Sequence, residues 1–192
     1  MTKKRGFEII SDFKDQNLNL PKRATKHAAG YDFEAAEDVE IPSIWHQVLS
    51  QIPVLLKESV SIKGAKSIKK GTNKKINEAN DNLVTAMTPT LVPTGIKAYM
   101  GDDEYLQLAN RSGNPIKEFL HLANGIGVID KDYYNNDSNE GHIMFQFINW
   151  GLGTKTIKKG DRIGQGVFIP FLKADNDSSS AERKGGFGST KK

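Results

Sequence analysis

Residues 143–150 read IMFQFINW, a run of apolar, β-branched and aromatic side chains that is closed by Gly151 and Gly153. Residues 163–171, IGQGVFIPF, have the same character and follow a polar turn at residues 159–161. Short apolar runs that are bounded by glycine and polar turn residues are typical of β-strands. These two segments therefore predict two strands in the C-terminal half of the chain.

Segments on the N-terminal side extend this pattern. Residues 91–100 place Val92, Ile96 and Tyr99 around a Pro-Thr-Gly turn, and residues 104–109 are a further strand candidate. The chain of 192 residues contains 18 glycines, and few of its segments have a helical period. This length fits one domain, and many short strands with frequent turns predict an all-β sandwich or barrel.

Residues 43–88 have a different character and predict a partly helical insertion. Ser43 is a suitable helix N-cap, and Pro53 should kink or end the helix that follows it. The apolar positions of this helix and of a second helical pattern are Ile44, Val48, Ile52 and Leu56, then Ile76, Ala79, Leu83 and Met87. The segment holds seven lysines against three acidic residues, an excess equal to the net charge of +4 of the whole chain. It is either a solvated lobe or a binding surface for a partner.

Composition excludes several classes of function. The chain has no cysteine, which removes disulfide frameworks, thiol catalysis and iron–sulfur clusters, and its four histidines lack the spacing of a zinc site. No apolar run approaches the roughly 20 residues that span a bilayer, and the N-terminus lacks the features of a secretion signal. The lysine-rich segment has only Trp45 near its start as an aromatic residue, so no specific nucleic-acid partner is expected. We therefore expect a cytoplasmic protein without a membrane partner.

Three polar segments are candidates for chemistry on a phosphorylated ligand. Asp130 and Asp132 follow a short apolar strand, and two residues apart on a strand they would face the same side. Such carboxylates either belong to a polar turn or orient a water for attack on phosphorus. Residues 111–113, Arg-Ser-Gly, suit a phosphate oxygen. Residues 160–165 are most simply a turn with an ion pair between Asp161 and Arg162.

The C-terminal residues 174–192 have almost nothing apolar to bury, which predicts disorder. Within them, residues 185–190 place one aromatic side chain among glycines and end in two hydroxyl groups. Glycine-rich backbone and hydroxyls bind anions, and Arg183 adds a cationic fork. The tail therefore also fits a mobile arm that orders over a phosphorylated ligand.

Five segments occur in an order that resembles the motifs of the trimeric dUTPases: residues 29–37 (AGYDFEAAE), 111–113 (RSG), 127–133 (GVIDKDY), 160–165 (GDRIGQ) and 185–190 (GGFGST). The resemblance covers nearly the whole chain outside the insertion. It implies a distorted jelly roll, a homotrimer with active sites at subunit interfaces, and hydrolysis of dUTP to dUMP and pyrophosphate with Mg²⁺. It also implies a β domain of residues 1–173, interrupted by residues 43–88, and an arm of residues 174–192 that closes an active site.

The same resemblance implies roles for single residues. Asp130 would orient the attacking water, Tyr133 would stand under the deoxyribose and exclude a 2′-hydroxyl, and Asp32 would reach Mg²⁺ through a water. The base and phosphate contacts would be Asn124, Gly127 and the hairpin backbone through Met144 for uracil, and Arg111, Ser112, Gly113 and Gln165 for phosphates. In the arm, Phe187 would stack on uracil, while the γ-phosphate would meet Arg183, Gly188, Ser189 and Thr190. One departure from the family pattern is the lengthened turn of residues 134–140 before Gly141.

The helical insertion resembles additions in phage dUTPases of Gram-positive hosts, some of which bind a repressor protein of mobile pathogenicity islands. The resemblance implies a second role for residues 43–88 in binding a repressor, and a location in the cytoplasm of a bacterial host. Two alternatives stay open. One is a catalytically weak or inactive member that acts mainly as a regulatory binding protein, and the other is a dCTP deaminase-like enzyme of the same fold.

Overall fold

The strands that the sequence predicts are present in the computed structural model. The structure describes residues 4–46, 48–50, 52–53, 81, 84–85, 87–180 and 183. Each apolar run predicted to be extended contains a strand, and the Pro-Thr-Gly turn separates two of them. The elements in chain order are β1 (Gly6–Ile9), η1 (Ser11–Gln16), β2 (Lys22–Arg23), β3 (Tyr31–Glu34), β4 (Val39–Ile41), β5 (Thr90–Pro93), β6 (Ile96–Tyr99), β7 (Glu104–Asn110), η2 (Asn114–Glu118), β8 (Leu120–Leu122), β9 (Gly127–Ile129), η3 (Lys131–Tyr133), β10 (Met144–Asn149), β11 (Lys155–Ile157) and β12 (Arg162–Pro170).

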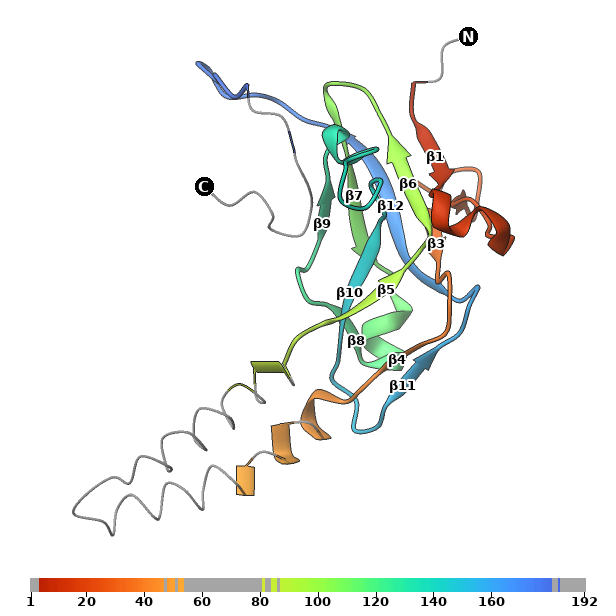
Figure 1. The fold of residues 1–192 in the computed structure, drawn as a ribbon, viewed down its shortest axis with the longest axis vertical. Helices are drawn as coiled ribbons and strands as arrows, with labels where there is room; N and C mark the ends of the chain where they lie inside the picture. Colours follow the sequence, from red (N-terminus) through yellow and green to blue (C-terminus); the bar gives the residue numbers. More distant parts are fainter. Residues whose placement is uncertain are drawn as a thin grey trace, which may run out of the picture.

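The strands form antiparallel ladders that make up one β body (Figure 1). The largest sheet has the order β2-β3-β12-β7-β9, so the predicted strand β12 lies at its centre. A second sheet has the order β5-β10-β8, and the pairs β1-β6 and β11-β4 complete the body. The predicted all-β jelly-roll fold is confirmed, and the strands predicted in residues 143–150 and 163–171 are present as β10 and β12.

The core joins the two larger sheets through aromatic side chains. The alternation of β10 turns Phe145 and Phe147 inward, where each is about 1% exposed. The ring of Phe145 meets Phe33 of β3 with the ring centroids 5.7 Å apart. A Cβ at Gly164 of β12 would collide with the Phe145 ring, so this glycine lets the ring lie against the strand backbone. Burial of one such ring stabilises the fold by about 1.5–3 kcal/mol.

The helix predicted after Ser43 is present over the described residues. Residues 44–46, 48–50 and 52–53 are helical, and the backbone N–H of His46 donates to the Ser43 hydroxyl at 3.5 Å, as an N-cap requires. Pro53 is the last described residue of this helix, so its predicted kink lies outside the described residues. Of the second pattern, Ile76, Ala79 and Leu83 lie outside them too, although residues 81 and 84–85 are helical. Within the described ranges, no helix has the length and apolar character needed to cross a membrane.

Candidate active site

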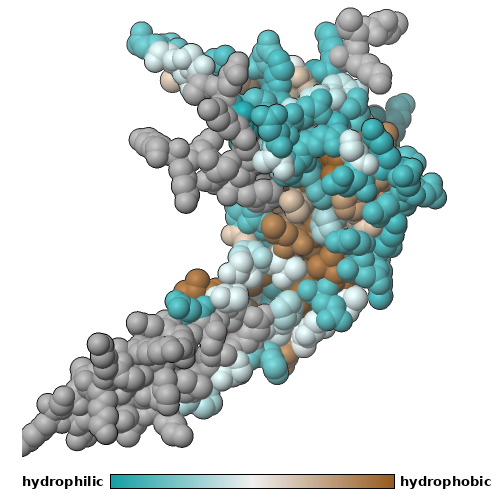
Figure 2. Space-filling view, viewed as in Figure 1, coloured by the Kyte–Doolittle hydropathy of each residue, from teal (hydrophilic) through white to brown (hydrophobic). Residues whose placement is uncertain are grey.

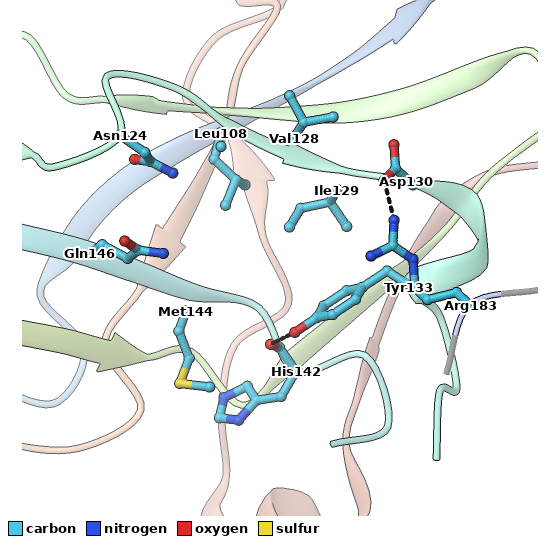
Figure 3. Close-up of a pocket in the computed structure, with 11 residues that line it drawn as sticks. Leu108, Asn124, Val128, Ile129, Asp130, Tyr133, His142, Met144, Gln146 and Arg183 are labelled. Atoms are coloured by element: carbon cyan, nitrogen blue, oxygen red, sulfur yellow. Dashed lines mark hydrogen bonds and ion pairs between the residues drawn. The ribbon is translucent and has the colours of Figure 1, made fainter. Parts of the chain in front are cut away.

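A cavity of about 200 Å³, which we call the hairpin cavity, lies between β9, η3 and β10 (Figure 3). It is lined by six residues that the sequence singled out: Asn124, Gly127, Asp130, Tyr133, Met144 and Arg183. Strand β9 ends at Ile129, and Asp130 has an extended backbone that leads into the 3₁₀ turn η3. This turn reverses the chain within three residues and brings the Tyr133 ring back over the cavity.

Arg183 binds both aspartates at the mouth of the hairpin cavity. Its Nη2 donates to Oδ2 of Asp130, and its Nε donates to Oδ1 of Asp132 at 2.7 Å. The guanidinium carbon also lies 5.9 Å from the centre of the Tyr133 ring. The sequence predicts Asp130 and Asp132 on one side of a strand, whereas they lie at the start of the 3₁₀ turn η3. Both carboxylates nevertheless bind the same partner, Arg183.

The Tyr133 hydroxyl is held from two sides. It donates to the backbone carbonyl of His142 at 3.0 Å and accepts from Nδ2 of Asn139 at 2.7 Å. The side chain is buried, and burial raises the pKa of the Tyr133 hydroxyl, while the bond from Asn139 acts in the opposite direction. The phenol is therefore neutral at physiological pH, and its ring is a fixed wall of the cavity.

Two carboxamides face the other end of the hairpin cavity. Asn124 reaches it from the turn before β9, and Gln146 reaches it from β10 (Figure 3). The backbone N–H of Ala123 donates to the Gln146 carbonyl at 2.9 Å, which ties the turn to the strand. Sequence reasoning missed Gln146, although the alternation of β10 places it on the same face as Met144.

His142 is a second lining residue that sequence reasoning missed, and no local pattern points to it. Its Nε2 accepts from the backbone N–H of Gly95 at 2.9 Å, and its ring packs on Phe13. Burial lowers the pKa of the His142 imidazole, and the nearby Asp12 opposes this shift. The ring is therefore a neutral structural acceptor beneath the cavity.

A second group of predicted residues gathers on the five-stranded sheet. Asp32 of β3 lies opposite Gln165 of β12, whose Nε2 donates to Asp32 Oδ1 at 2.9 Å. Arg162 donates to Asp32 Oδ2 at 3.2 Å, so the predicted ion pair between Asp161 and Arg162 is wrong. Asp161 instead accepts from the backbone N–H of Lys158 at 2.8 Å and closes the turn between them. The cause is the β3–β12 pairing, which brings Asp32 within reach of both donors.

Arg111 extends this second group into a separate cavity of about 450 Å³, which we call the Arg111 cavity. Its Nη1 donates to the backbone carbonyl of Arg162 at 2.9 Å, and both arginines line the cavity together with Lys155. Ser112 is exposed, and a Cβ on Gly113 would have no atom within 4 Å. Among the described residues, none lines both the Arg111 cavity and the hairpin cavity.

The remaining predicted contacts are in the arm or concern the metal. Phe187, Gly188, Ser189 and Thr190 lie outside the described residues. In the part of the chain that the structure describes, no three His, Cys, Asp or Glu side chains are grouped so that they could hold a metal ion. Asp32 is the single metal contact that the sequence predicts, and it lies on β3 beside Gln165 and Arg162.

The dUTPase family profile matches residues 75–191 of the chain. The deoxyuridine 5'-triphosphate nucleotidohydrolase of Lactococcus lactis is 42% identical over 188 residues, which are 97% of this chain and 97% of that protein. The chain belongs to the dUTPase family. Its reaction is that of a dUTP diphosphatase, and the alternative of a dCTP deaminase-like enzyme is set aside.

Solved structures of other dUTPases have a similar fold. The dUTPase from Streptococcus mutans is 41% identical, with a TM-score of 0.64 over 89% of this chain and 99% of that one. The dUTPase from phage phi11 of S. aureus, described with a species-specific insert, is 16% identical, with a TM-score of 0.57 over 93% of this chain and 97% of that one. The phage likeness concerns the fold alone.

Proposed function

We propose that the hairpin cavity of this dUTPase binds the deoxyuridine part of dUTP and that Asp130 orients the water that attacks the α-phosphorus. The observation that carries this proposal is the order of groups around the cavity. A carboxylate and a phenol stand at one end, and two carboxamides stand at the other. A carboxylate within reach of a water accepts its proton as the bond to phosphorus forms.

The base end accounts for the choice of uracil. A carboxamide offers both donors and acceptors, which Asn124 and Gln146 present to a base edge that itself alternates acceptor, donor and acceptor. Gly127 and Met144 complete the walls of a cavity of about 200 Å³. Cytosine would leave buried polar groups unpaired, which is a strong basis for rejection. The Tyr133 ring, fixed by its hydroxyl, would stand under the deoxyribose and exclude a 2′-hydroxyl by contact.

The second group of residues would receive the triphosphate and Mg²⁺. Arg111, Ser112, Gly113 and Gln165 would contact phosphate oxygens, with Arg111 able to offer a guanidinium fork. Asp32 accepts one hydrogen bond on each carboxylate oxygen and keeps further lone pairs, which fits contact with Mg²⁺ through a water. When bound, Mg²⁺ would neutralise negative charge on the phosphates.

The arm would take part through Arg183, Phe187, Gly188, Ser189 and Thr190. Arg183 now bonds to Asp130, and a guanidinium that binds a carboxylate also suits a phosphate. When dUTP binds, Arg183 would leave Asp130 and bind the γ-phosphate instead. Asp130 would then be free to bind the attacking water, and the arm would lie over the nucleotide. Phe187 would then stack on uracil.

We propose the homotrimer that the family resemblance implies, and the separation of the two groups supports sites that are shared between chains. The proposed base and sugar contacts line one cavity, and the proposed phosphate contact Arg111 lines another with no common described residue. One dUTP molecule would therefore use the two groups from different chains. Asp130→Asn and Arg111→Ala proteins should each be weak alone but regain activity when they are unfolded together and refolded as a mixture. No recovery in mixed oligomers would mean that each chain builds its own complete site.

The catalytic role of Asp130 is tested by Asp130→Asn. We expect kcat for pyrophosphate release from dUTP to fall by about 10²–10⁴-fold, with nucleotide affinity nearly unchanged. Asp132→Asn is the matched control, because Asp132 shares the contact with Arg183 but is not assigned the water. Equal losses in the two variants would remove Asp130 from the catalytic role.

The insertion of residues 43–88 supports a second, regulatory role. Its described part exposes Trp45, Leu49, Val84 and Met87, each between 42% and 68%. Figure 2 shows hydrophobic residues at the surface around the junction between the β body and the insertion. We propose that this surface binds a repressor protein of the kind bound by some phage dUTPases.

The two ends of the insertion make a clean deletion possible. Ile44 and Met87 line the same small pocket beside β10, so a short linker can replace residues 47–86. The shortened protein should keep dUTP turnover and lose the complex that the full chain forms with a purified repressor on gel filtration. Loss of turnover while the trimer persists would contradict a separable insertion.

A further inference from the structure

The lengthened turn of residues 134–140 is an ordered loop and not a loose tip. Oδ1 of Asn136 accepts from the backbone N–H and the hydroxyl of Ser138, at 3.0 and 2.6 Å, and from the backbone N–H of Asn139 at 3.3 Å. Nδ2 of Asn136 donates to the Tyr133 carbonyl at 2.8 Å. Asn136 is only 8% exposed, so these bonds are largely shielded from water. A single side chain thus organises the turn around the backbone of Tyr133.

The loop ends in a direct contact with the Tyr133 hydroxyl. Asn139 donates from Nδ2 to Tyr133 at 2.7 Å, and its Oδ1 accepts from Nδ2 of Asn136 at 2.9 Å and from the backbone N–H of Gly141 at 3.2 Å. The amide orientation of Asn139 is therefore set by two donors on its oxygen, which leaves its nitrogen to face the phenol. In this series of hydrogen bonds, Asn136 donates to Asn139 and Asn139 donates to the Tyr133 hydroxyl.

The β body anchors this loop on its other side. Lys97 of β6 donates to Oδ1 of Asn135 at 2.7 Å and pairs with Glu140, and the backbone N–H of Ser11 donates to Glu140 at 2.8 Å. The bond from Lys97 is the main reason that the pKa of Glu140 is lowered to about 2. The Tyr134 hydroxyl donates to Glu8 at 2.7 Å. The loop is therefore fixed to three separate elements, and Asn139 cannot drift with the tip.

We infer that Asn139 is a positioning residue that sets the place of the Tyr133 ring and thereby the discrimination between deoxyribose and ribose. The inference rests on the sugar role proposed above for Tyr133. UTP differs from dUTP by the one oxygen atom of its 2′-hydroxyl. A steric contact can exclude this atom only if the Tyr133 ring keeps a fixed position. The His142 carbonyl alone would leave the phenol one partner, around which the ring can shift, whereas the second bond from Asn139 defines its position. Displacements of about 1 Å at such sites commonly cost a hundredfold in rate.

The experiment compares kcat/KM for dUTP and for UTP in the full-length protein. Asn139→Ala should lower the dUTP-to-UTP ratio by about three- to tenfold, the effect of losing one hydrogen bond. The change should come from faster UTP turnover, with KM for dUTP nearly unchanged. Ser138→Ala is the matched control, because it removes a hydrogen bond in the same loop that does not reach Tyr133. That variant should keep the ratio of the parent protein.

A double-mutant cycle separates positioning from general loosening. Tyr133→Phe should lower the ratio, and Asn139→Ala added to it should have no further effect, because the hydroxyl that Asn139 holds is gone. If Asn139→Ala does not fold, Asn139→Asp keeps the acceptor for Asn136 and Gly141, removes the donor, and carries the same test. A ratio within twofold of the parent in the Asn139 variant, or full additivity in the double variant, overturns the inference.

A separate variant tests whether Tyr133 contacts the sugar at all. Tyr133→Ala should bring the dUTP-to-UTP ratio down further than any Asn139 variant does. If Tyr133→Ala leaves the ratio unchanged, the sugar role of Tyr133 fails and the inference about Asn139 fails with it. If Tyr133→Ala lowers the ratio and the Asn139 variants do not, the sugar role stands and only the positioning role is overturned.

Discussion

Gly141 closes the loop behind Tyr133, and Gly141→Ala should destabilise the protein through two separable effects. Its backbone has a φ of +84°, which L-residues with a side chain adopt at a cost of about 1–2 kcal/mol. In addition, a Cβ would lie 2.7 Å from the Tyr133 carbonyl oxygen and 3.1 Å from the Tyr134 Cα. These are backbone atoms, which cannot rotate away, so we expect a further cost of about 1–3 kcal/mol.

Two other glycines supply the matched controls. Gly160 has a φ of +86° with no atom within 4 Å of its Cβ position, so Gly160→Ala reports the backbone cost alone. Gly153 also has open space, and its φ lies outside the left-handed range, so Gly153→Ala should change the free energy of unfolding by less than about 1 kcal/mol. The expected order of destabilisation is Gly141, then Gly160, then Gly153.

The assay is urea unfolding at one fixed protein concentration, because association makes apparent stability depend on concentration. Gly141→Ala should lose about 2–4 kcal/mol in total, and each kcal/mol should lower the melting temperature by about 2–4 °C in a chain of this size. If Gly141→Ala loses no more than Gly160→Ala does, the loop yields to the new Cβ. The rigidity on which the role of Asn139 depends would then be refuted.

Three further predictions concern the core, the buried histidine and the metal contact. Phe145→Ala should lower the free energy of unfolding by about 3–5 kcal/mol in the same assay, and a loss below about 1 kcal/mol would contradict its place in the core. Because burial lowers the pKa of His142, the unfolded chain takes up a proton at its ordinary value of about 6.5 before the folded chain does. Stability should therefore be retained above that pH and decline as the pH falls below it, and His142→Gln should flatten this part of the urea profile. Asp32→Asn should raise the Mg²⁺ concentration for half-maximal pyrophosphate release by about tenfold or more, and an unchanged requirement would exclude the proposed contact.

The strands and the hairpin side of the site were predictable because their signals are local. Alternation in residues 144–149 already separates Phe145 and Phe147 from Met144 and Gln146, and a closer reading of that pattern would have found Gln146. Asn124, Asp130 and Tyr133 lie within ten residues of one another, so a single turn brings them to one cavity. Their common place in the site was implied by the resemblance to the trimeric dUTPases.

Contacts between distant segments were not predictable in the same way. The expected ion pair of Arg162 with its neighbour Asp161 is the simplest local solution, but Arg162 bonds to Asp32, which is 130 positions away. The same holds for the bond of Gly95 to His142 and for the anchoring of the loop by Lys97. Each of these depends on which strands pair and in what register.

The sequence by itself determined the fold class, the family and most of the residues proposed for the site, because periodicity, turn residues and ordered motifs are written along the chain. Only the tertiary structure decided how these residues are divided and supported. It placed Asp130 and Tyr133 around one cavity and Arg111 at another, and it turned residues 134–140 into a support for the Tyr133 hydroxyl. The physical reason is that a buried hydrogen bond needs its partners within about 3 Å, a distance set by strand register and packing over the whole β body and not by spacing along the chain.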